Sequence, residues 1–180
     1  MSKKCDPDLS PEEGWTEVQL VQTLLGCRSF VSDDPHGDGD RLKIKYYLRD
    51  TDKEIVGRVW FGPGAEGPPG HAHGGSMAAV LDESMGAAVW AAGYTVLTGD
   101  LAVKYLRPLP LETTVIMETW LEDADGRKVV AGGHLIDNNG KPYCEGRCTF
   151  VELSHERFSG GRMGDLPGFL QLGKISRNSK

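Results

Sequence analysis

A histidine- and glycine-rich motif followed by a carboxylate pair is the part of this sequence best suited to chemistry. Residues 71–75 read His-Ala-His-Gly-Gly, and an Ala-, Met- and Leu-rich stretch then continues to Trp90 with Asp82 and Glu83 in its middle. Ala, Met and Leu favour helix formation. We expect a helix from Gly74 to Trp90 that is apolar nearly all round and therefore buried.

The glycine pair would place unpaired backbone amides at the start of this helix. The first N–H groups of a helix have no acceptor within it, and they can hold an anion or polarise a carbonyl that gains negative charge. Gly74 and Gly75 have no side chains, so a ligand can approach these amides closely. Ser76 can accept a hydrogen bond from an early amide, as N-cap residues do. The alternative is that the glycines only form a tight turn, which His73 orients.

Asp82 is the candidate general base or nucleophile. A carboxylate on an apolar helix stripe is costly unless it has partners, and such a setting would raise its pKa. The alternative is a structural carboxylate that pairs with a buried donor. Glu83 lies about 100 degrees further round the helix, so only one of the two is expected to face a given site, and Glu83 could pair with a surface cation.

The spacing of these residues has a consequence for assembly. Gly75 and Asp82 are seven residues apart, or roughly 10 Å along a helix axis. That is too far for both to act on one carbonyl carbon. If both are catalytic, they come from different subunits, and the chemistry predicts an isologous dimer.

Further polar residues follow the helix. Thr98 begins the next strand, where its hydroxyl could position a water or simply belong to the sheet. His71 and His73 could share a strand face as metal ligands, but no nearby residues complete a ligand set, and we expect no metal and no cofactor. Near strand ends lies a basic set that could bind phosphates or could be an ordinary solvated face: Lys104, Arg107, Arg127 and Lys128.

The elements that must position these residues give an α+β architecture. Ser10 and Pro11 followed by two glutamates signal a helix start, and we expect a short amphipathic helix to about Cys27. One long helix against a curved antiparallel sheet would cover the apolar helix. We therefore divide the chain into an N-terminal extension (1–39), a main domain (40–153) and a tail (154–180). The predicted strands are residues 41–49, 54–61, 95–106, 113–122, 127–136 and 142–153.

Composition limits the partners of the protein. The net charge is −6, which does not suggest nucleic acid. The first twenty residues are polar and acidic rather than signal-like, and the paired carboxylates argue against a membrane span for the central helix. Cys144 and Cys148 are too far apart along a strand for a disulfide without a bend, so we expect half-buried free thiols and a cytoplasmic protein.

Taken together, these motifs resemble the hotdog-fold acyl-CoA thioesterases, most closely the PaaI-type branch and the related mammalian thioesterase-superfamily proteins. Those proteins carry HGG, an aspartate nine residues after the histidine, and a Y-x-R-P-x-P strand end. The spacing from His73 to Asp82 is the same here. The resemblance covers roughly residues 40–153, and the runs that carry it are Pro69–Gly75, Leu81–Gly86, Thr98–Leu101 and Tyr105–Pro110.

The resemblance implies roles for individual residues. The Gly74 amide, alone or together with that of Gly75, would polarise a thioester carbonyl, Asp82 would be the base or nucleophile, and Thr98 would help to place the water. It also implies homodimers joined sheet edge to sheet edge, which in this family often pair into tetramers. Four positions match residues that contact CoA in the mammalian relatives: Lys104, Leu106, Arg127 and Lys128.

One departure and two rival functions stand beside this interpretation. Some relatives place an asparagine in the loop before HGG, whereas residues 64–70 here contain none, so an asparagine-assisted mechanism does not carry over. A non-catalytic acyl-CoA-binding module could keep HGG but would not need Asp82. A hydratase on the same fold would need a histidine–acid pair that His73 does not obviously supply.

Overall fold

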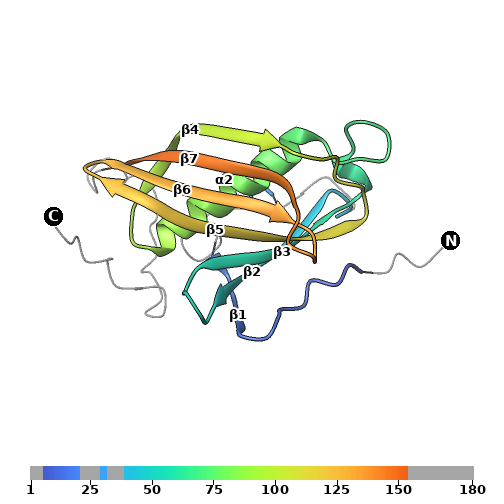
Figure 1. Ribbon diagram of the computed structural model, residues 1–180, viewed down its shortest axis with the longest axis horizontal. Helices are drawn as coiled ribbons and strands as arrows, with labels where there is room; N and C mark the ends of the chain where they lie inside the picture. The colour runs from blue at the N-terminus through green and yellow to red at the C-terminus, as the bar shows by residue number, and fades with distance from the viewer. Residues whose placement is uncertain (1–5, 21–28, 32–38, 154–180) are drawn as a thin grey trace.

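The computed structural model describes residues 6–20, 29–31 and 39–153 and shows one antiparallel sheet curved around one long helix (Figure 1). Seven strands form the sheet in the order β1-β2-β3-β5-β6-β7-β4. The long helix is α2 (Gly74–Ala91), and a short 3₁₀ turn, η1 (Pro63–Ala65), precedes it. The strands are β1 (Trp15–Val18), β2 (Leu42–Arg49), β3 (Ile55–Phe61), β4 (Val96–Tyr105), β5 (Thr113–Asp125), β6 (Lys128–Ile136) and β7 (Pro142–Glu152).

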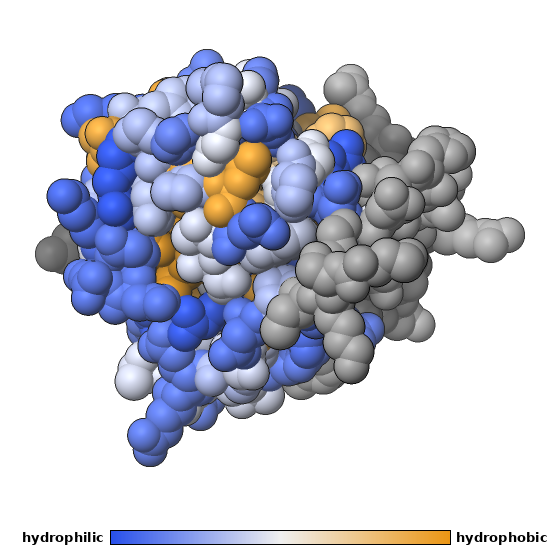
Figure 2. All heavy atoms as spheres, turned by 90° about the vertical axis from the view of Figure 1, so that its right-hand side faces the viewer, coloured by the Kyte–Doolittle hydropathy of each residue, from blue (hydrophilic) through white to orange (hydrophobic). Residues whose placement is uncertain are grey.

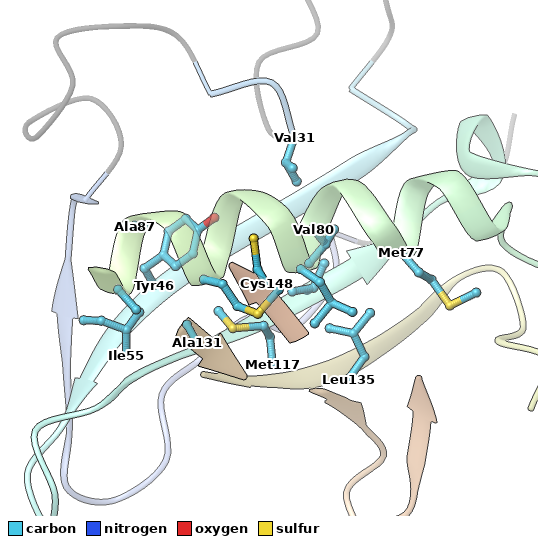
Figure 3. Packing of buried hydrophobic residues seen from close by; sticks show 14 of the residues in the cluster. Val31, Tyr46, Ile55, Met77, Val80, Ala87, Met117, Ala131, Leu135 and Cys148 are labelled. Carbon is cyan, nitrogen blue, oxygen red and sulfur yellow. The ribbon is translucent and has the colours of Figure 1, made fainter. Parts of the chain in front are cut away.

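The hydrophobic core lies between the concave face of the sheet and α2. Alternate residues of the strands point inward, and Met117, Leu135 and Cys148 all meet the helix in this way (Figure 3). On the other side of α2, Val31 packs against the helix and is 1% exposed. The prediction of a long buried helix inside a curved antiparallel sheet is therefore confirmed.

The predicted strands of the main domain are also confirmed, with ends shifted by a few residues, but their order in the sheet is not a simple meander. β4 does not pair with the strand that follows it in the chain; it pairs with β7, at one edge of the sheet. A register shift between Thr98 and Asp100 interrupts this pairing. The outer side of β4 has no partner strand within the described chain.

The predicted helix start at Ser10 and Pro11 is wrong. Gly14 has φ +78°, a left-handed conformation that suits a turn, and the next residues form β1, which pairs with β2. The ring of Trp15 lies 5.6 Å from that of Tyr47 on β2. Packing of this aromatic pair and the added strand pairing outweigh the local helix signal. The rest of that predicted helix, residues 21–27, lies outside the described residues, as does the predicted tail.

Candidate active site

The start of α2 is held by a loop that pairs with the connection between β4 and β5. The Ala72 N–H donates to the carbonyl of Leu109 at 2.8 Å, and the Leu111 N–H donates to the carbonyl of Gly70 at 3.0 Å. Leu109 is fully buried, which anchors this connection in the core. The backbone N–H of His73 donates to the carbonyl of Ala65 at 2.8 Å. The loop before the helix is therefore held both by the β4–β5 connection and by the 3₁₀ turn η1.

His73 is the N-cap of α2. Its Nδ1 accepts a hydrogen bond from the Gly75 N–H at 2.9 Å, so the ring proton must lie on Nε2. The expectation that Ser76 caps the helix is wrong, because its hydroxyl instead donates to the carbonyl of His73 at 2.7 Å. The sequence-based idea that His73 orients the glycine turn is confirmed, and its ring does so as a hydrogen-bond acceptor.

This cap separates the two glycine amides that sequence reasoning grouped together. The Gly75 N–H is committed to His73, whereas the Gly74 N–H has no acceptor among the described residues. Gly74 is half-buried at the first position of the helix, where the dipole favours negative charge. The structure therefore offers one amide, that of Gly74, to an incoming oxygen. Its carbonyl accepts a hydrogen bond from the hydroxyl of Tyr105 at 2.9 Å, a contact that sequence reasoning missed.

Two turns further along α2, Asp82 meets Thr98. The Thr98 hydroxyl donates to Oδ1 of Asp82 at 2.8 Å, and Oδ2 has no partner among the residues that the structure describes. Asp82 is half-buried on the side of α2 that faces β4, and Thr98 is exposed. Burial, followed by the charge of Asp82, raises the pKa of the neighbouring Cys148 thiol to about 12. This carboxylate is thus held by one hydroxyl and keeps one oxygen free for a water or a substrate.

Within one chain the free amide and the free carboxylate oxygen do not meet. Gly74 and Asp82 are eight residues apart on one helix, which is about 12 Å along its axis. Both lie on the side of α2 next to β4, the strand at the open edge of the sheet. A second molecule at that edge is needed before the two groups can act on one carbonyl.

Glu83 has different surroundings from Asp82, and it pairs with no cation among the residues that the structure describes. Its carboxylate accepts hydrogen bonds from the Ser29 hydroxyl at 2.7 Å, the Tyr46 hydroxyl at 3.1 Å and the Val31 N–H at 3.2 Å. Burial and the charge of Glu83 raise the pKa of the Tyr46 hydroxyl well above its ordinary value, so that it remains a donor. Glu83 is therefore the structural carboxylate of the pair.

The predicted basic set does not form one cluster. In the strand register, Lys104 lies opposite Glu145 of β7, and Lys128 lies opposite Val151 of the same strand. The two lysines are therefore six residues apart along β7, or about 20 Å. Lys104 and Leu106 are exposed near the start of α2, whereas Arg127 and Lys128 are exposed at the far end of the sheet.

Arg107 has a structural role near the end of β4. Its guanidinium pairs with Asp137 at 2.7 Å, donates to backbone carbonyls of Pro142 and Lys141, and lies 3.6 Å from the ring centroid of Tyr143. These contacts use Nε and Nη2 and fix the end of β4 to the β6–β7 hairpin. Its expected part in phosphate binding stays a prediction.

The described residues contain no group of three or more His, Cys, Asp or Glu side chains that could hold a metal ion. Cys144 and Cys148 are free, as expected, and they are fully buried rather than half-buried. None of the helices in the described ranges is long and apolar enough to cross a membrane.

The face of the molecule at which α2 begins is mostly hydrophilic, with apolar side chains in small separate patches (Figure 2).

Comparisons with known proteins agree with this architecture. Residues 69–144, from the loop before α2 to the beginning of β7, match the family model of the thioesterase superfamily. A crystal structure of a thioesterase superfamily protein is similar with a TM-score of 0.58 and 30% identity, over 61% of this chain and 53% of that chain. A thioesterase from Streptococcus pneumoniae, crystallised with coenzyme A, has a TM-score of 0.54 at 18% identity, over 56% of this chain and 79% of that chain.

The fold is thus the hotdog fold, and residues 69–144 are similar to the thioesterase superfamily. The sequence is 30% identical to acyl-coenzyme A thioesterase THEM4 of Bos taurus over 86% of this chain and 60% of that protein. It is 38% identical to THEM4 of Xenopus laevis over 64% of this chain and 53% of that protein. For THEM5 of Homo sapiens the identity is 32%, over 68% of this chain and 50% of that protein. This chain thus spans only 50 to 60% of the length of these relatives.

Proposed function

We propose that this protein hydrolyses acyl-CoA thioesters to a carboxylic acid and free CoA. Two groups on the same side of α2 carry the proposal. The Gly74 amide at the start of the helix has no acceptor among the described residues, and one carboxylate oxygen of Asp82 has no donor among them. The relatives named acyl-coenzyme A thioesterase support this reaction, as do neighbours of the same fold crystallised with coenzyme A.

In the proposed reaction the Gly74 N–H donates to the thioester carbonyl oxygen and stabilises the negative charge that forms on it. Asp82 of the partner subunit then takes a proton from a water that attacks the carbonyl carbon, or attacks that carbon itself to form a mixed anhydride, which a water then hydrolyses to regenerate the aspartate. The C–S bond breaks, the sulfur leaves as the CoA thiolate and takes up a proton, and the acyl group leaves as a carboxylic acid. Thr98 orients Asp82 through the 2.8 Å hydrogen bond.

We propose a homodimer joined at the β4 edge as the active unit, because the two groups are about 12 Å apart within one chain. The side of α2 that carries Asp82 faces this edge, and β4 is largely exposed. Two copies related by a two-fold axis would bring each helix start near the other copy's aspartate. Such an arrangement forms two sites per dimer. Assignment to the PaaI-type branch and any pairing into tetramers remain predictions.

The test is thiol release, followed with a colorimetric thiol reagent, over acyl-CoAs from acetyl to palmitoyl and including aryl-acetyl thioesters. The variant Asp82→Asn should lose at least about 100-fold in kcat, since it cannot take a proton or attack carbon. A matched control is Asp100→Asn, which changes an exposed carboxylate of the same strand as Thr98. Full activity of Asp82→Asn would refute the mechanism. Tight binding of an acyl-CoA without turnover in the wild type would favour a non-catalytic binding module.

A further inference from the structure

Tyr105 lies at the C-terminal end of β4, directly against the start of α2. Its hydroxyl donates to the carbonyl of Gly74 at 2.9 Å. Its ring lies so close that a Cβ at Gly74 would be 3.2 Å from the ring carbon that carries the hydroxyl. The side chain is about half exposed, with 50% of its area open. It therefore borders the surface from which a ligand would reach the Gly74 amide.

The contacts of Tyr105 and His73 act on one peptide unit. The carbonyl of Gly74 and the N–H of Gly75 belong to the same planar peptide group. Tyr105 donates to the carbonyl, and His73 Nδ1 accepts from the N–H. A glycine pair has wide backbone freedom, so an unclamped Gly74–Gly75 peptide could rotate and carry the adjacent amide with it. The Gly74 N–H itself belongs to the preceding peptide, whose carbonyl on His73 accepts from the Ser76 N–H at 2.9 Å and from the Ser76 hydroxyl at 2.7 Å. With the peptides on both sides of Gly74 held, the direction of its N–H is fixed.

We propose that Tyr105 is a positioning residue of the thioesterase site, which holds the Gly74 amide in the direction needed to stabilise the oxyanion. This inference rests on the proposed function. Burial, and to a lesser extent the nearby Cys144, raise the pKa of the Tyr105 hydroxyl, so the hydroxyl keeps its proton and donates at any pH at which the protein would work. A Cβ at position 74 would come tightly against this ring, so the ring would have to shift to accept a larger residue.

Tyr105→Phe removes only the hydroxyl and keeps the ring, so it tests the hydrogen bond without opening a cavity. We expect kcat to fall about tenfold with KM within about twofold, because the interaction matters most when charge develops on the carbonyl oxygen. Tyr94→Phe is the matched control, since Tyr94 follows the far end of α2 and packs against the core. It should leave both constants unchanged.

A binding measurement separates positioning from a merely structural role. One probe is an acyl-CoA analogue with a trifluoromethyl ketone in place of the thioester, which adds a nucleophile and mimics the oxyanion. The other is a CoA thioether of equal chain length without a carbonyl. Tyr105→Phe should weaken binding of the ketone about tenfold and leave that of the thioether unchanged.

Each outcome decides the question. Unchanged kcat and an unchanged ratio of the two affinities would overturn the inference. An equal loss for both probes, with raised KM and unchanged kcat, would make Tyr105 a wall of the binding site and would also overturn it. If the wild type hydrolyses no acyl-CoA, the proposed function fails on its own, whereas the affinity ratio of the two probes still tests Tyr105.

Discussion

Asp82 and Glu83 are neighbours in the chain, but α2 turns them toward different surroundings. Thr98 holds one oxygen of Asp82, and the other remains free on the side of the helix next to β4. Glu83 uses its carboxylate to hold residues 29–31 and the Tyr46 side chain against the helix. A carboxylate that accepts three hydrogen bonds from neutral donors is well satisfied. One residue therefore remains available for chemistry while the other stabilises the fold.

Replacing Glu83 with Gln should destabilise the protein by about 2 kcal/mol, because hydrogen bonds to a charged group are worth about 1.5–3 kcal/mol. In addition, the NH2 group of the glutamine would face a hydrogen-bond donor where the carboxylate oxygen accepted a bond. The free energy of unfolding in guanidinium measures this effect. Glu13→Gln in the exposed turn before β1 is the control and should change stability by less than about 0.5 kcal/mol. An equally small change for Glu83→Gln would show that its hydrogen bonds do not hold this part of the fold.

Sequence reasoning could place this carboxylate pair on a buried helix but could not divide the roles. The partners of Glu83 are up to 54 residues away in the chain, and no local sequence pattern predicts them. The capping role of His73 was open for the same reason, since Ser is the commoner cap and Ser76 was the obvious candidate. Arg107 looked like a free cation because Asp137, its partner, becomes a neighbour only when the β6–β7 hairpin forms.

At the scale of elements, the antiparallel packing of α2 and β4 positions every candidate catalytic group. The helix of eighteen residues is about 27 Å long, and a strand that turns back after Gly93 covers that length in about eight residues. If the strand begins at Val96, it returns to the level of the helix start about eight residues later, near residue 104. The same count applied to the sequence could have suggested Tyr105 as a neighbour of Gly74.

The order of the strands in the sheet, in contrast, could not be predicted from the sequence pattern. Alternation of apolar and polar residues identifies a strand and its inward face, but it does not say which strand lies beside it. The pairing of β4 with β7 closes a loop of more than thirty residues, and only the complete sheet decides it. The strand at Trp15–Val18 was missed because four residues are too few for a pattern to outweigh a helix-start signal.

The open edge of β4 leads to a prediction about assembly. Lysine on an edge strand opposes pairing with another strand, because its charge would have to be buried. Ala102 is exposed at the middle of β4, so Ala102→Lys should convert the proposed dimer to a monomer and reduce thioester hydrolysis at least about tenfold. Light scattering coupled to size-exclusion chromatography measures the mass, and thiol release measures the activity.

The opposite edge of the sheet provides the control for this variant. Thr16 is exposed on β1, the strand at the other edge, and Thr16→Lys should leave both mass and activity unchanged. If Ala102→Lys remained an active dimer, the β4 edge could not be the interface. A dimer broken by Thr16→Lys instead would move the interface to β1.

At the scale of the whole molecule, the outer face of the sheet carries an ion cluster that ties distant strands together. Glu118 on β5 pairs with Arg49 on β2 and lies 2.7 Å from Nε2 of His134 on β6. Arg49 also pairs with Asp52 at 2.7 Å and with Glu54 at 3.3 Å. The cluster therefore bridges three strands that span most of the width of the sheet.

This cluster makes stability depend on pH in a direction that follows from Glu118. The hydrogen bond from His134 and then the contact with Arg49 lower the pKa of Glu118 below its ordinary value of 4.5. A carboxylate with a lowered pKa in the folded state contributes stability above its ordinary pKa, and this contribution is lost as the pH falls through the folded pKa. Because Glu118 is partly open to solvent, which screens the charges, we expect a contribution of about 1 kcal/mol.

Glu118→Gln should therefore be about 1 kcal/mol less stable than the wild type near pH 7, and the two unfolding free energies should converge as the pH falls through the lowered pKa of Glu118. Guanidinium unfolding at a series of pH values measures both curves. Glu13→Gln, which removes an exposed carboxylate outside the cluster, should follow the wild type throughout. Parallel curves for Glu118→Gln and the wild type would show that Glu118 does not carry the acid response. The acid sensitivity of the protein would then have to arise at other carboxylates, of which Asp52 beside Arg49 also has a lowered pKa.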